Sequence, residues 1–200
     1  FLTENGIAIL SSETLMIGNS TEVIFVLDML RYLNNGRNLE AKAGTLRYIA
    51  EFLQDKLPIH DFIAEGMNFQ DENLFEKFLN ENNLQISFSS LRRKSLYESV
   101  ELIVSKFINR KMDNAYIQYF LDLVLERDMK NSAGIGDFLS YWDKNGEKFS
   151  IPSPEGKDAV KIMTIHKSKG LEFPVVIFPF AEENYSKSPR EKLWLNGEET

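Results

Sequence analysis

The chain has 200 residues, a formal net charge of -7 and a hydrophobic fraction of 43%. This length and apolar content can supply a packed core, so we expect a folded protein and not a disordered tail. No apolar run approaches the roughly 20 residues of a membrane-spanning helix, and the first residues do not resemble a signal peptide, so no membrane partner is expected.

Cysteine is absent, and the two histidines, His60 and His166, are far apart in the sequence. Disulfides and thiolate zinc sites are therefore excluded, no metal site is expected, and a cytoplasmic location is favoured. The excess of carboxylates argues against a free-standing protein that binds nucleic acid tightly, because phosphate binding depends on clusters of lysine and arginine. We therefore expect any DNA contact to be local or shared with other parts of a larger protein.

The first segment has the order strand, turn, helix, which is typical of an α/β unit. Residues 6–10 are typical of a short buried strand. Ser20 or Thr21 can cap a helix with apolar residues at helical spacing, and residues 34–36 (Asn-Asn-Gly) predict its end. The chain starts at Phe1 without an initiator methionine, in what resembles the end of a helix, so we expect a piece of a longer protein.

A different character follows, because amphipathic helical patterns succeed one another from about residue 38 to about residue 150. The expected helices lie at 39–56, 71–82, 95–110, 113–130 and 134–146. Ser95 and Glu98 have the spacing of a capping box, and Asp113 is an N-cap candidate. Residues 151–156 contain two prolines and a glycine, so they predict a linker.

After this linker the α/β character returns. Strands are expected at 159–164 and at 175–178, and a polar, cationic loop lies between them. The predicted fold class is therefore α/β with a mostly helical insertion, in which residues 1–37 and 151–200 form the α/β part and residues 38–150 form the inserted helical domain.

The loop between these two strands carries side chains suited to binding phosphate. In α/β proteins, ligands usually bind at the carboxyl ends of sheet strands. Thr164 offers a hydroxyl and His166 an imidazole, and Lys167 and Lys169 add ammonium groups. The alternative is an ordinary surface loop in which these cations are simply solvated.

Two further residues of the loop suit a nucleotide. Gly170 permits a close approach of the backbone to a ligand or a turn with positive φ. Glu172 differs from the cations, because a carboxylate repels phosphate but accepts hydrogen bonds from sugar hydroxyls.

Residues 160–176 (VKIMTIHKSKGLEFPVV) closely resemble motif V of the UvrD/RecB DNA helicase family, in its RecB/AddA-like form. Residues 6–13 are similar to the stretch just past motif IV of that family. The resemblance implies that the α/β part is a partial RecA-like sheet of the P-loop NTPase type, from the second core domain of a helicase. The helical region then corresponds to the domain inserted in that core domain.

The resemblance also implies roles for the loop residues. Glu172 matches the glutamate that meets the ribose of the nucleotide, and Gly170 matches the glycine that admits its close approach. The other matching positions contact or electrostatically support the DNA backbone, and these are Thr164, His166, Lys167 and Lys169.

The family's ATP-cleaving groups are missing from this sequence. It contains no Gly-x-x-x-x-Gly-Lys-Ser/Thr phosphate loop, and the arginine of motif VI would lie beyond Thr200. Asp28 and the pair Asp71-Glu72 superficially imitate acidic metal-binding residues, but ordinary helix positions explain them better. We therefore expect no catalytic residue and no ATP hydrolysis by this chain alone.

For the longer parent protein, the resemblance implies an ATP-dependent 3′-to-5′ DNA helicase of DNA repair or recombination. Its cofactors would be ATP and magnesium, its substrates single-stranded and duplex DNA, and its partner a nuclease subunit or fused nuclease domain. The alternative is a non-catalytic, helicase-derived scaffold that binds proteins; the acidic charge favours this alternative and the complete motif opposes it.

Two other groups of residues have both a functional and an ordinary interpretation. Residues 92–94 (Arg-Arg-Lys) are candidates for contact with duplex DNA or are a solvated basic run. The remaining group is aromatic and forms either a platform for stacking bases or part of the core; it comprises Tyr116, Tyr119, Phe120, Tyr141 and Trp142.

Overall fold

The computed structural model describes residues 8–11, 16–54, 56–108, 114–131, 134–151 and 159–178. The chain divides into two compact units, residues 1–162 and residues 163–200. Among the described residues, no helix has the length and apolar character required to cross a membrane.

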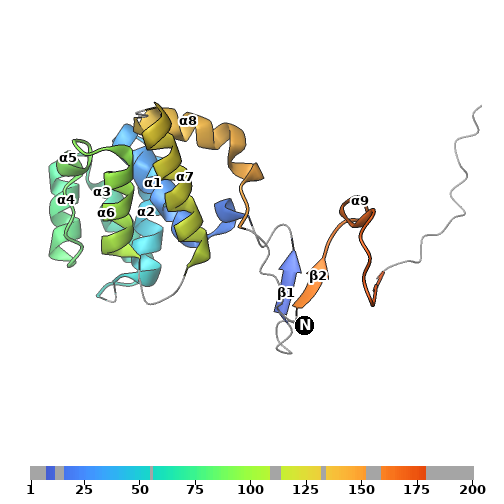
Figure 1. Cartoon of the computed structure of the whole chain (residues 1–200). Helices are drawn as coiled ribbons and strands as arrows, with labels where there is room; N and C mark the ends of the chain where they lie inside the picture. The colour runs from blue at the N-terminus through green and yellow to red at the C-terminus, as the bar shows by residue number, and fades with distance from the viewer. Residues whose placement is uncertain are drawn as a thin grey trace, which may run out of the picture. The chain divides into compact units, whose positions relative to one another are not determined.

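The first unit is mostly helical (Figure 1). Its helices are α1 (Thr21–Asn34), α2 (Leu39–Phe52), α3 (Ile59–Asn68), α4 (Glu72–Glu81), α5 (Phe88–Leu91), α6 (Leu96–Phe107), α7 (Ala115–Asn131) and α8 (Ile135–Asn145). Two 3-10 turns, η2 (Ile17–Asn19) and η3 (Gly146–Lys148), precede α1 and follow α8. The same unit contains the strands β1 (Ala8–Ser11) and β2 (Ala159–Ile162).

The sequence predicted the long helices correctly, because their apolar spacing and caps agree. Ser95 and Glu98 form the expected capping box of α6, and the Asp71 side chain accepts hydrogen bonds from the backbone of Asn73 and Leu74 at the start of α4. Ser20 stands at the N-cap of α1 but donates its hydroxyl to Glu22 instead of capping the helix. The expected cap at Asp113 and most of the expected linker lie outside the described residues.

Helix α1 is the central helix of the helical core. It packs against α2, α6, α7 and α8, and its buried residues lie on several sides of the helix. A helix that is apolar all round is stable only when neighbours surround it. The expected boundary between residues 37 and 38 therefore falls between two helices, α1 and α2, that pack together.

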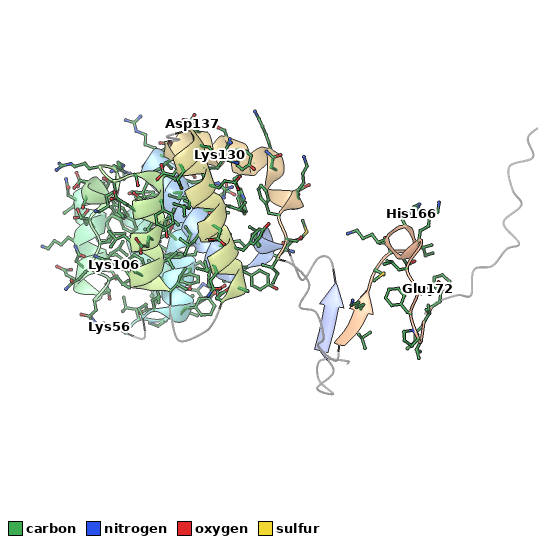
Figure 2. The ribbon with its side chains drawn as sticks, in the orientation of Figure 1. Lys56, Lys106, Lys130, Asp137, His166 and Glu172 are labelled. Atoms are coloured by element: carbon green, nitrogen blue, oxygen red, sulfur yellow. The ribbon has the colours of Figure 1, made fainter. Side chains whose placement is uncertain are left out.

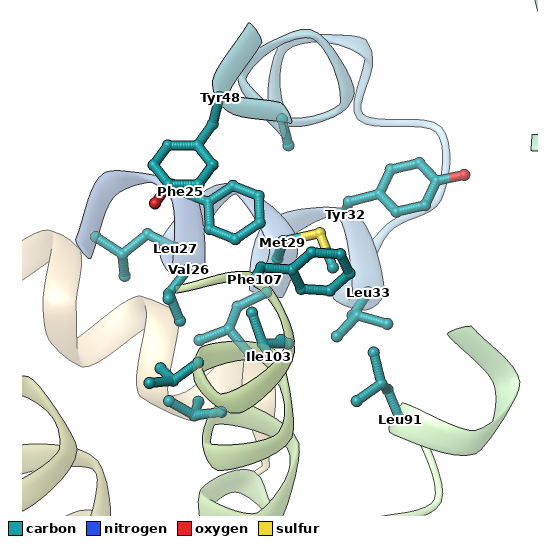
Figure 3. Packing of buried hydrophobic residues seen from close by; sticks show 14 of the residues in the cluster. Phe25, Val26, Leu27, Met29, Tyr32, Leu33, Tyr48, Leu91, Ile103 and Phe107 are labelled. Atoms are coloured by element: carbon teal, nitrogen blue, oxygen red, sulfur yellow. The ribbon is translucent and has the colours of Figure 1, made fainter. Parts of the chain in front are cut away.

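Aromatic rings fill the space around α1 (Figure 3). Phe25 stacks on Tyr48 of α2 with ring centroids 4.2 Å apart and meets Phe107 of α6 edge-on at 5.7 Å. Farther along the same helix, Tyr32 meets Phe75 of α4 and Phe88 of α5. Such edge-to-face and offset contacts contribute beyond simple area burial, so they tie the short helices α4 and α5 to the core.

The two strands of the first unit pair in parallel, although about 150 residues separate them in the chain. Ala8 lies opposite Ala159 and Ser11 lies opposite Ile162. Where the chain enters and leaves the helical region, Met16 and Ser150 form an antiparallel bridge and Ile17 N donates to Phe149 O at 3.1 Å. All the helices from α1 to α8 therefore lie, in chain order, between two strands that are hydrogen-bonded to each other.

The second predicted C-terminal strand is wrong as the structure describes it. Val175, Val176, Ile177 and Phe178 form no strand pairing and are 62–79% exposed. A strand requires a neighbouring strand to satisfy its backbone groups, and the described residues provide none for this segment. The helices α3 and α5, and the short α9 (Ile165–Ser168) of the second unit, were not predicted, because four to ten residues give too few apolar repeats.

Candidate functional site

The predicted phosphate-binding loop, which follows β2 directly in the chain, contains one helical turn. Thr164 is the N-cap of α9, and its hydroxyl oxygen accepts a hydrogen bond from Lys167 N at 3.4 Å. The Thr164 carbonyl accepts from Lys167 N at 3.0 Å and from Ser168 N at 3.1 Å. The segment is thus an ordered turn, where the sequence predicted an irregular loop.

The turn ends at a glycine with the conformation that the sequence required of it. Gly170 has a φ of +84°, the left-handed region that side chains other than glycine rarely adopt. An ideal Cβ atom at this position would meet no atom within 4 Å. In this chain, therefore, backbone conformation accounts for the glycine, and the space beside it is open to a ligand.

The predicted DNA-binding side chains are exposed. Thr164, His166, Lys167 and Lys169 all lie at the surface of the second unit, and Figure 2 shows His166 on the α9 turn. Within the described part of the chain, neither lysine forms an ion pair with a carboxylate. Two ammonium groups and an imidazole are thus available to an anionic ligand without first breaking an internal salt bridge.

Glu172 lies on the extended segment after the turn and is also exposed (Figure 2). Its carboxylate can accept hydrogen bonds from ribose hydroxyls, which fits one edge of a nucleotide. Among the described residues, no group of three or more His, Asp or Glu side chains is placed to hold a metal ion. The described residues therefore fit the sugar of ATP but supply no magnesium site.

Sequence reasoning missed Ser168, whose hydroxyl donates to the carbonyl of Ile165 at 2.9 Å and closes the same turn. The sequence did carry a signal for this turn. A threonine followed by a glycine six residues later is the spacing of a capped single helical turn with a left-handed residue after it.

The structure accounts for the acidic residues that imitate metal ligands in the sequence. Asp28 lies within α1, and Asp71 caps α4. Burial raises the pKa of Asp28 above its ordinary value, and the neighbouring Arg31 opposes that rise. Both carboxylates therefore have structural roles in the helical region.

The basic run before α6 does not act as a unit. Arg92 binds both carboxylate oxygens of Glu72 at 2.6 Å and donates from Nε to the carbonyl of Leu33 at 2.8 Å. Only Arg93 and Lys94 remain as exposed cations of this run. Of the aromatic group, Phe120 and Trp142 are buried and contact each other, so they belong to the core and not to a stacking platform.

A small pocket of about 60 Å³ lies in the helical region between α5 and α6. Its walls include Ile86, Leu91, Ile103 and Phe107, and Lys106 lies at its edge. Nucleotide and cofactor sites have volumes of roughly 300–1,000 Å³, so this pocket is too small to be one.

Comparison with known proteins agrees with the motif. Residues 144–199, which include the whole motif, match the family model described as the UvrD-like helicase C-terminal domain. The chain is 31% identical over 195 residues to the ATP-dependent helicase/nuclease subunit AddA of Streptococcus sanguinis (strain SK36), an alignment that covers 78% of this chain and 16% of that protein.

A second relative gives the same result. The chain is 28% identical over 200 residues to the protein of the same name from Staphylococcus aureus (strain JH9), covering 84% of this chain and 16% of the relative. The chain thus spans about 16% of the length of the curated relatives that it matches.

Proposed function

Because the chain belongs to the UvrD/RecB-type helicases of the AddA-like form, we propose that it is part of an ATP-dependent, 3′-to-5′ DNA translocase. It contributes one wall of the ATP cleft and one part of the single-strand track. The observation that carries this proposal is the motif at residues 160–176, in which exposed cations and an exposed carboxylate follow a strand.

The chain's two kinds of ligand contact are separated along the motif. Thr164, His166, Lys167 and Lys169 contact or support the phosphodiester backbone of single-stranded DNA. Glu172 accepts a hydrogen bond from the ribose, and Gly170 leaves room for the nucleotide. This division follows from charge, since cations attract the phosphates of the strand and a carboxylate suits only the uncharged sugar.

The parallel pair β1–β2 supports a RecA-like sheet, because parallel pairing over a long insertion is typical of α/β proteins. Two strands are too few for a stable sheet. We place Val175–Phe178, which is apolar and exposed, in a further strand of that sheet once the rest of the core domain is present. The inserted domain then runs from about residue 16 to about residue 151, since α1 is part of its core.

ATP hydrolysis requires groups outside this chain. The sequence has no phosphate loop, so nothing in it grips the β- and γ-phosphates, and ATP and magnesium act only in the longer protein. The purified 200-residue chain should therefore show no ATPase activity with or without single-stranded DNA. DNA-stimulated turnover that co-purifies with the 23.1 kDa species would contradict this expectation.

The DNA track is tested with a matched pair of lysine variants in the longer protein. Lys167→Ala should weaken binding of a labelled oligothymidine and lower the slope of log affinity against log salt by about 0.7, which is the contribution of one phosphate contact on a single strand. Lys144→Ala removes an exposed lysine from α8 and should change neither quantity.

Equal effects of the two substitutions would show that only overall charge matters, and would remove Lys167 from the track. The same measurement separates the scaffold alternative, which predicts no single-strand binding that depends on the motif. The nuclease partner suggested by the relatives' name is tested by isolating the longer protein and assaying the complex for DNA degradation.

A further inference from the structure

The hydroxyl of Thr164 is engaged within its own turn. Its oxygen accepts from Lys167 N, and the same N–H also donates to the Thr164 carbonyl at 3.0 Å. Ser168 N donates to that carbonyl at 3.1 Å. Three hydrogen bonds therefore converge on one residue at the start of the turn.

The far end of the turn is closed as well. The Ser168 hydroxyl donates to Ile165 O at 2.9 Å, and Leu171 N donates to Ser168 O at 3.0 Å. Gly170 then reverses the backbone with its φ of +84°. None of these bonds uses the side chain of His166 or Lys167, so both side chains stay exposed while the backbone beneath them is fixed.

A single helical turn of four residues has no stability of its own, because nucleation costs more conformational entropy than one turn of hydrogen bonds returns. The orientation of His166 and Lys167 therefore depends on the bonds that close the turn. We infer that Thr164 is a positioning residue of the DNA contact: its hydroxyl holds the turn that presents His166 and Lys167, and does not itself bind the strand. This inference rests on the proposed function.

The first test is made in the longer protein with two substitutions of one residue. Thr164→Val keeps the shape of the side chain and removes the hydroxyl, and should weaken binding of an oligothymidine by about five-fold, the effect of losing a typical N-cap. Thr164→Ser keeps the cap and should restore affinity to within about two-fold of the unsubstituted protein. Failure of serine to restore affinity would overturn the inference.

A double-mutant cycle distinguishes positioning from direct contact. In a protein that already carries His166→Ala and Lys167→Ala, Thr164→Val should have little further effect, since the side chains that it positions are gone. An undiminished loss of about five-fold in that background would show that Thr164 binds DNA itself and would overturn the inference. If His166→Ala and Lys167→Ala together leave DNA affinity unchanged, the proposed function fails and the inference fails with it.

A structural measurement on the 200-residue chain completes the test. Thr164→Val should speed hydrogen exchange at the Lys167 amide, which loses one of its two acceptors, and should leave the buried amides of α1 unchanged. Unchanged exchange at Lys167 would mean that the hydroxyl does not hold the turn, and would also overturn the inference.

Discussion

Arg92 and Glu72 form a two-pronged ion pair, in which Nη1 and Nη2 each bind one carboxylate oxygen at 2.6 Å. The same guanidinium donates from Nε to the carbonyl of Leu33 at the end of α1. One side chain thus joins the last turn of α1, the first turn of α4 and the segment before α6. Bidentate pairs of this kind are stronger than ordinary surface salt bridges.

Replacing this arginine should destabilise the helical region although the positive charge is kept. Arg92→Lys loses the fork and the bond to Leu33, and we expect the free energy of unfolding to fall by about 1 kcal/mol, because both partners remain about one-third exposed to screening solvent. Urea denaturation measures the change. Lys77→Ala, which breaks an exposed pair with Glu81 at 3.8 Å, is the control and should have no measurable effect. Equal effects of both substitutions would contradict the special role of the fork.

The contact between α2 and α3 is close enough to require a glycine. A Cβ atom on Gly66 would lie 2.6 Å from Leu46 Cδ2 and 2.8 Å from Leu46 Cδ1, and Leu46 is fully buried. Gly66→Ala should lower the free energy of unfolding by about 1 kcal/mol, because overpacking outweighs the better helix propensity of alanine.

A second substitution tests the cause of that loss. In a Leu46→Ala background the clash is absent, so Gly66→Ala should become neutral or stabilising. Gly18→Ala is a control, since its Cβ would make only an ordinary 3.7 Å contact with Trp142. A loss from Gly66→Ala that persists unchanged in the Leu46→Ala background would refute the steric explanation.

Two buried tyrosines should make the protein sensitive to alkali. Burial raises the pKa of Tyr32 and of Tyr48 from 10.0 to about 12, with neighbouring carboxylates adding to the rise. Between pH 10 and about 12 the unfolded chain has lost these protons and the folded chain retains them, so stability falls as pH rises through this range.

Tyr48→Phe should reduce this alkaline loss, which is measured as the difference in unfolding free energy from the unsubstituted protein at about pH 9 and at about pH 11.5. The buried Lys42 has a pKa lowered by burial and contributes the opposite slope on the alkaline side, but it is present in both proteins and cancels in the difference. A difference that does not change with pH would contradict the burial of the Tyr48 hydroxyl group.

The contrast between α1 and residues 175–178 shows what the sequence could predict. Helix α1 was found from its apolar spacing, but its assignment to the α/β part followed from chain order alone. Packing on several faces places it in the helical core. Val175–Phe178 was predicted as a strand because it is apolar and rich in β-branched residues, yet a strand depends on partners that local sequence does not reveal.

The candidate site divides in the same way. The chemical identity of its donors and its carboxylate was readable from the sequence, and the positive φ of Gly170 followed from the residue type. The turn that holds His166 and Lys167 was not predicted, because it depends on hydroxyl hydrogen bonds of Thr164 and Ser168 and not on an apolar repeat.

His166 and Glu172 should act on different ligands of the longer protein. His166→Ala removes a proposed DNA contact, so it should weaken DNA-stimulated ATP hydrolysis and leave the affinity for a fluorescent ATP analogue nearly intact. Glu172→Gln keeps the size of the side chain and one acceptor oxygen but loses the charge, so it should chiefly lower nucleotide affinity. A hydrogen bond to a charged group contributes about 1.5–3 kcal/mol, so either loss is roughly 10- to 150-fold. If both variants only lowered the melting temperature, and the folded protein bound DNA and nucleotide as before, the segment would be structural and its proposed chemistry wrong.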